Sequence, residues 1–192
     1  MSRQYWSETL SWATASGTAV ANTTTETILF PNITIPAGFL QDGRALRVTA
    51  FGAYGTTATP TLQLRLRWGG VSGTVLAATG AITTTSAVGG GASMLALWTF
   101  EAIIQTRSNG SAGTLMTNGQ LVTYTDTPLT AGTVTNYGQP SALASGSTGG
   151  DTPVAVTADL TADTALSLTA TWGTANAANS IQGLNYVIEA LN

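Results

Sequence analysis

The stretch Pro60-Thr-Leu-Gln-Leu-Arg-Leu-Arg-Trp-Gly-Gly70 alternates apolar and polar side chains. Three leucines and a tryptophan occupy one side of this period of two, and Gln63, Arg65 and Arg67 occupy the other. Successive side chains of a β-strand point to opposite faces, so the period matches a strand with one face in a core and one face in water. The stretch therefore predicts a half-buried antiparallel strand that ends at a Gly-Gly turn.

The same kind of pattern recurs along the chain. Residues 165–173 repeat both the alternation and the tryptophan at the end of it, Trp172. Either the two segments are equivalent strands in the two halves of a jelly roll, or any two amphipathic strands that end in an aromatic residue look alike. Residues 94–106 are apolar on both sides in places and predict a central strand. Further strands are expected at 27–30, 33–35, 46–50, 115–124, 154–160 and 181–191.

Gly-, Pro- and Asn-rich turns separate these runs, and no convincing helix longer than a turn or two is found. Many strands at short spacing indicate an all-β fold: a single antiparallel β-sandwich or jelly roll of about 8–10 strands with an N-terminal arm. We expect the arm at 1–17 and the jelly-roll domain at 18–192. Residues 127–153, rich in Thr, Gly, Ser and Ala, are expected to form an excursion, either with a short hairpin near 133–137 or as an extended loop.

Composition excludes much chemistry. Only 8% of the 192 residues are charged, all six basic residues are arginines, and Lys, His and Cys are absent. The chain therefore has no imidazole base, no Ser-His-Asp triad, no Schiff-base lysine, no ordinary zinc site and no disulfide. We expect no catalytic residue, no cofactor and no metal site.

The net charge and the scarcity of charged residues indicate which kinds of partner the protein can bind. A net charge of −3 argues against nucleic acid as the main partner. No apolar run reaches the roughly 20 residues of a membrane helix, so no membrane contact is expected, and charges near the N-terminus argue against a secretory signal. A weakly charged surface suits a protein that packs against copies of itself or a partner. A Lys-poor coding habit of the source would give the same composition.

Carboxylates are the only remaining acid or base groups. In an extended segment the α-carbons of Asp159 and Asp163 would lie roughly 13 Å apart, which is wide for a glycosidase pair. In a turn the two aspartates would either bind Ca²⁺ or serve as ordinary turn residues. Glu101, in an otherwise apolar strand, would be either a catalytic acid with a perturbed pKa or a partnered or interface glutamate.

Arginines and terminal aromatic residues are the candidate contact residues. Arg65 and Arg67 share one strand face, and Arg47 is expected on a neighbouring strand. Such a face would either dock an acidic partner through bidentate hydrogen bonds or simply be solvated.

The arm carries three aromatic residues, Tyr5, Trp6 and Trp12. Aromatic side chains anchor interfaces, so we expect the arm to pack either against this subunit's own barrel or against another chain.

Four segments carry a resemblance to a known class of proteins. They are 25–37 (Thr25-Glu-Thr-Ile-Leu-Phe-Pro-Asn-Ile-Thr-Ile-Pro-Ala37), 42–47, 60–70 and 159–172. Their strand and turn patterns resemble small jelly-roll virion proteins of tailed bacteriophages, namely capsid decoration (cement) proteins and related head fibre or spike components. The likeness spans roughly 25–191 and includes no catalytic signature. It implies a homotrimer on the outer capsid surface of the virion, with the major capsid protein as partner, which stabilises the shell by bridging capsomers.

Two other functions stay open. A receptor- or glycan-binding module of a tail fibre or head spike would use exposed aromatics in 127–153, with Tyr137 as the candidate. A glycan hydrolase would have to rely on carboxylates alone, and their spacing would decide that case.

Overall fold

The computed structural model describes residues 7–57, 59–84, 94, 96–124, 138–146 and 152–191. These residues contain fourteen strands and no helix, which confirms the all-β prediction. The strands are β1 (Ser7–Trp12), β2 (Val20–Ala21), β3 (Thr27–Ile28), β4 (Ile33–Ile35), β5 (Ala45–Gly55), β6 (Thr61–Trp68), β7 (Thr74–Ala78), β8 (Ile82–Thr83), β9 (Ala96–Ser108), β10 (Gly113–Tyr124), β11 (Gly138–Ser145), β12 (Val156–Ala158), β13 (Thr164–Trp172) and β14 (Ser180–Leu191).

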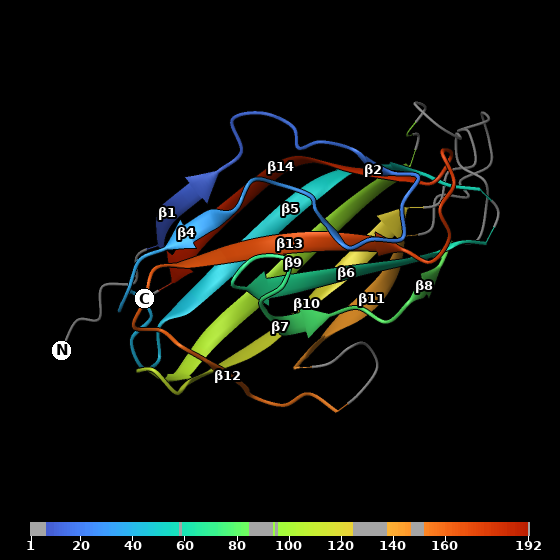
Figure 1. Cartoon of the computed structure of the whole chain (residues 1–192). Helices are drawn as coiled ribbons and strands as arrows, with labels where there is room; N and C mark the ends of the chain where they lie inside the picture. Colours follow the sequence, from blue (N-terminus) through green and yellow to red (C-terminus); the bar gives the residue numbers. More distant parts are fainter. Residues whose placement is uncertain are drawn as a thin grey trace.

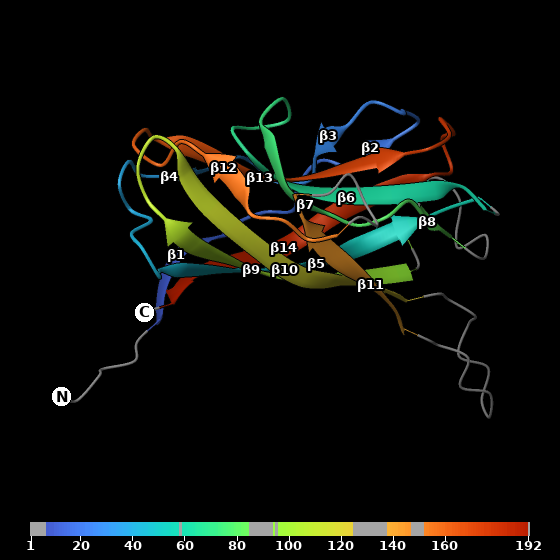
Figure 2. The ribbon, with the colours of Figure 1, turned by 90° about the horizontal axis from the view of Figure 1, so that it is seen from below.

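The strands form two facing layers that are joined along one side. Neighbouring strands follow the order β1-β14-β5-β9-β10-β11-β7-β6-β13-β3, and every pairing is antiparallel. In Figure 1, β13 and β6 cross in front of β5, β9 and β10, and Figure 2 shows the two groups as separate layers. Strand β11 pairs with β10 along most of its length and with β7 at its end, so the sheet curls from one layer into the other. The predicted antiparallel sandwich of the jelly-roll kind is confirmed.

The core lies between the layers and follows the alternation in the sequence. The leucines of β6 are buried, as are Trp98 of β9 and Trp172 of β13. Two glycines make room for aromatic rings. A Cβ at Gly52 would lie 2.7 Å from the ring of Trp98, and one at Gly183 would lie 2.2 Å from the ring of Phe30. Both distances are too short for carbon atoms, so the rings fit only because these positions have no side chain.

The two look-alike segments are neighbours in one layer. Strands β6 and β13 pair antiparallel, with Leu62 opposite Trp172 and Trp68 opposite Leu166. Each tryptophan thus lies beside the first leucine of the other strand. Both indole N–H groups are satisfied, because Trp68 donates to the Asp159 carbonyl at 3.0 Å and Trp172 donates to the carbonyl of Val20 at 3.2 Å.

Strand lengths account for the difference between the predicted and observed strand numbers. Nine of the fourteen strands have five or more residues, and the other five have only two or three. The predicted central strand is β9, which lies between β5 and β10.

Three of the nine longer strands were not predicted. Strand β1 lies inside the segment 1–17 that the sequence set apart as an arm, where it pairs with β14. It is an edge strand with mostly exposed or half-buried side chains and a register shift, so its apolar signal is weak. Strand β7 is short, so its alternation is hard to recognise in the sequence. Strand β11 contains Pro140, a residue that weakens a strand prediction. The hairpin expected at 133–137 lies outside the described residues.

Candidate functional site

The three candidate arginines do not share one surface. Arg65 and Arg67 lie on the solvent side of β6, whereas Arg47 lies on β5 in the opposite layer. Strand β5 pairs with β14 and β9, and β6 pairs with β7, β8 and β13. The expectation that Arg47 occupies a strand beside Arg65 and Arg67 is therefore wrong, because alternation shows which side of a strand faces out but not which strands are neighbours.

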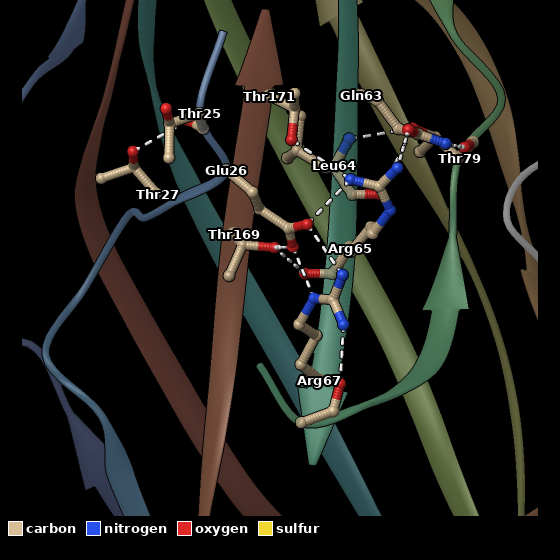
Figure 3. Close-up of polar contacts among 11 residues, drawn as sticks. Thr25, Glu26, Thr27, Gln63, Leu64, Arg65, Arg67, Thr79, Thr169 and Thr171 are labelled. Carbon is tan, nitrogen blue, oxygen red and sulfur yellow. Dashed lines mark hydrogen bonds and ion pairs between the residues drawn. The ribbon is translucent and has the colours of Figure 1, made fainter. Parts of the chain in front are cut away.

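Arg65 and Arg67 are bound by Glu26 of the same chain (Figure 3). Glu26 precedes the short edge strand β3, and its carboxylate reaches across β13 to β6. Arg65 Nη1 donates to Glu26 Oε2 at 3.0 Å, and Arg67 donates through Nε to Oε1 and through Nη2 to Oε2, the latter at 2.7 Å. Thr169 of β13 donates its hydroxyl to Glu26 Oε1. The cluster thus ties three neighbouring strands together.

Burial and neighbouring charges shift the pKa of Glu26 in opposite directions. Its side chain is 16% exposed, and those of Arg65 and Arg67 are 18% and 15% exposed. Partial burial by itself raises the pKa of Glu26, but hydrogen bonds from Arg67 and Thr169 and the charges of both arginines outweigh it and hold the pKa below its ordinary value. Both arginines therefore already have an acidic partner, and their contact in this structure is internal.

Most described carboxylates are engaged in turns or ion pairs. Asp159 accepts hydrogen bonds from the Thr161 hydroxyl and backbone N–H, which lower its pKa. Asp163 accepts from the backbone N–H of Ala37 at 2.8 Å, and Asp42 accepts from the backbone N–H of Asn109 at 2.7 Å. Asp159 thus bonds within its own loop, and Asp163 bonds to the backbone of the turn that follows β4. Within the described ranges, no three acidic side chains gather in a way that could hold a metal ion.

Exposed apolar side chains gather on one surface. We call it the outer face: the side of β1, β14, β5, β9, β10 and β11 that points away from β6 and β13, along the lower side of Figure 2. Of the five exposed large hydrophobic residues in the described part of the chain, four lie here. They are Trp12 (59% exposed), Phe51 (44%), Leu97 (55%) and Tyr124 (37%). Only Val154 lies elsewhere.

The strand register makes this surface continuous. One row across the strands pairs Trp12 with Val187, then Val187 with Thr49. The next row pairs Phe51 with Thr99. The row after that pairs Ala53 with Leu97. Residues directly opposite on one face of a sheet lie about 5 Å apart, so Trp12, Phe51 and Leu97 belong to one surface.

Charges on the outer face largely neutralise one another. Arg47 Nη1 lies 3.6 Å from a carboxylate oxygen of Glu189, and its Nε lies 3.9 Å from one of Glu101. Arg107 is an exposed arginine further along β9, so the described charges on this face are two positive and two negative. Glu101 is thus a partnered surface glutamate.

A shallow hollow of about 430 Å³ lies on the outer face between β9, β10 and β11. Its exposed lining includes Glu101, Asn118, Gln120 and Ala142. A carboxylate and two amides offer hydrogen-bond donors and acceptors, so the hollow has the polar groups that a hydroxyl-rich ligand would need.

Of the three aromatic residues expected on the arm, the structure describes only Trp12. Tyr5 and Trp6 lie outside the described residues, as does Tyr137. Trp12 is exposed at the edge of the outer face and close to Val187 in register. Phe51, Leu97 and Tyr124 were not predicted as contact residues, although each is a large apolar or aromatic residue at a solvent-facing position of its strand, which is the signal that could have found them.

Comparison with known proteins adds no relative. No protein-family model and no curated protein matches this chain. The described residues form no helix long and apolar enough to cross a membrane. The functional interpretation thus depends on the geometry above and on the resemblance seen in the sequence.

Proposed function

We propose that this chain is a structural virion protein, most specifically a capsid decoration protein that binds the outer capsid surface as a homotrimer. The observation that carries the proposal is the outer face, where four exposed large apolar side chains share a surface of balanced charge. Several large exposed apolar side chains on one face are a signal of an interaction site. The sandwich fold agrees with the jelly-roll class that the sequence resembles.

In this proposal the protein acts through binding energy alone and is not an enzyme. Most described carboxylates bond to backbone or to arginine, and the chain has no histidine, lysine or cysteine to supply other acid–base or nucleophilic chemistry. Many copies that each bury area against the major capsid protein would bridge capsomers and restrain the shell. Trp12 is our candidate for a capsid or subunit contact, because it is large, aromatic and exposed.

The test is reconstitution on particles. Virions from which this gene has been deleted are mixed with purified wild-type protein, with the Trp12→Ser variant or with Val154→Ser as a matched control on an exposed apolar residue elsewhere. We expect saturable binding at a fixed ratio to the coat protein for the wild type and the control, and at least tenfold weaker binding for Trp12→Ser. Absence of the chain from wild-type virions would refute the proposal, and equal binding of all three proteins would remove Trp12 from the contact.

A second candidate function is a receptor- or glycan-binding module of a tail fibre or head spike. The observation in its favour is the polar hollow with Glu101, Asn118 and Gln120. A glycan array probed with the wild type and with Asn118→Ala decides between the two. Saturable sugar binding that the variant loses would favour the second candidate, and no binding to any sugar would eliminate it.

A further inference from the structure

We infer that the outer face is covered by a second copy of this chain. The inference deepens the proposed function, because it assigns a surface to the self-association that the function requires. The inference depends on three properties of one described sheet face, namely its size, its charge and its apolar content.

Size is the first argument. The four long strands of the face, β14, β5, β9 and β10, have 12, 11, 13 and 12 residues. At about 3.3 Å per residue and about 4.8 Å between strands, they cover roughly 700–800 Å². A stable protein interface buries about 800 Å² on each partner. The face is therefore large enough for a subunit contact without help from another surface.

Charge is the second argument. Arg47 and Arg107 balance Glu101 and Glu189, so two identical copies of this face meet without net like-charge repulsion. A partner selected by charge would instead need a surface of one sign. The arrangement fits contact with another copy of the same weakly charged chain.

Apolar content is the third argument. Phe51 and Leu97 lie on adjacent strands, and Phe51 is directly opposite Thr99 in the register. Both side chains are about half exposed although β5 and β9 are interior strands of the sheet. Covering them removes apolar surface from water, and burial of one such half-exposed side chain is worth roughly three- to tenfold in affinity.

The experiment measures the mass of the purified protein by light scattering across a concentration series to about 200 μM. The variant Phe51→Thr/Leu97→Thr keeps β-forming residues, Val154→Thr is the matched control, and thermal melts verify folding. We expect wild type and control at two or three times 19.5 kDa and the double variant at 19.5 kDa over the range where the wild type associates. A monomeric wild type, or a double variant with wild-type mass, would overturn the inference.

A single-cysteine variant gives a second readout, since the chain has no native cysteine. We expect Thr99→Cys to be shielded from a thiol reagent at concentrations where the protein associates and to be labelled on dilution, whereas Val154→Cys is labelled throughout. Labelling of Thr99→Cys at one rate under both conditions would contradict the inference. A monomer that still binds virions would overturn the inference and the homotrimer, assign the face to the coat protein, and leave only the virion-binding part of the proposed function intact. An oligomer absent from virions would refute the function and leave the inference intact.

Discussion

Glu26 shows how one residue can hold distant parts of this chain together. It binds Arg65 and Arg67, which are 39 and 41 positions away, and Thr169, which is 143 positions away. Through it, the edge strand β3 is tied across β13 to β6 (Figure 3). The alternation in 60–70 correctly predicted that both arginines face outward. No local pattern could predict their partner, because an ion pair between distant segments leaves no period in the sequence.

We expect Glu26→Gln to lower the free energy of unfolding by about 2 kcal/mol. This value lies between the ~0.5 kcal/mol of an exposed ion pair and the ~4 kcal/mol lost when a buried pair loses one partner. The control is Glu189→Gln, whose partner Arg47 is 40% exposed, and for it we expect a loss below about 1 kcal/mol. Urea denaturation at pH 7 measures both.

The lowered pKa of Glu26 gives this prediction a pH dependence. A carboxyl group whose pKa is lower in the folded state stabilises the fold above its unfolded pKa of about 4.3, and that contribution is lost as the pH falls through the folded pKa. The difference in unfolding free energy between wild type and Glu26→Gln should therefore be constant from pH 7 to about 5 and shrink below about pH 4. A difference that stays constant down to pH 3 would contradict the role of the charge.

At the scale of elements, the period of two predicted the long strands better than the short ones. Strands β6 and β13 pack leucine and tryptophan inward and present Thr, Gln or Arg on the other side, so their positions follow from alternation alone. Strand β1 has few apolar residues, and the apolar signal of β7 is too short to stand out. The pairing order was not predictable either, since β6 and β13 are adjacent in space but lie far apart in the chain.

The contacts of β5 with both β9 and β14 depend on Gly52, a position without a side chain. A Cβ at Gly52 would lie 1.9 Å from the Gln182 carbonyl oxygen as well as close to Trp98. We expect Gly52→Ala to lower the unfolding free energy by about 2 kcal/mol, because backbone and ring must both shift. Gly80 has no atom within 4 Å of such a Cβ, so Gly80→Ala should change stability by less than about 0.5 kcal/mol. Equal thermal midpoints for the two variants would show that the packing around Gly52 is looser than described.

At the scale of the whole molecule, the scarcity of charge and the placement of apolar residues point to the same kind of function. The chain has 8% charged residues, and most of the charges in the described part are paired or bonded to backbone. Its exposed apolar residues lie mainly on the outer face. Composition favoured a protein that works by packing, but it could not locate the outer face that we propose as the packing surface, since that required the register of β5, β9 and β14.

The most direct measurement is a reconstruction of the purified virion by electron microscopy at a resolution that separates strands. We predict density for this sandwich on the outside of the shell, with β14, β5, β9 and β10 facing a second copy and Trp12 at a subunit or capsid contact. Density in which the outer face is open to solvent on every copy would contradict the assigned surface. A complete reconstruction without this chain would contradict the central claim that it is a structural part of the particle.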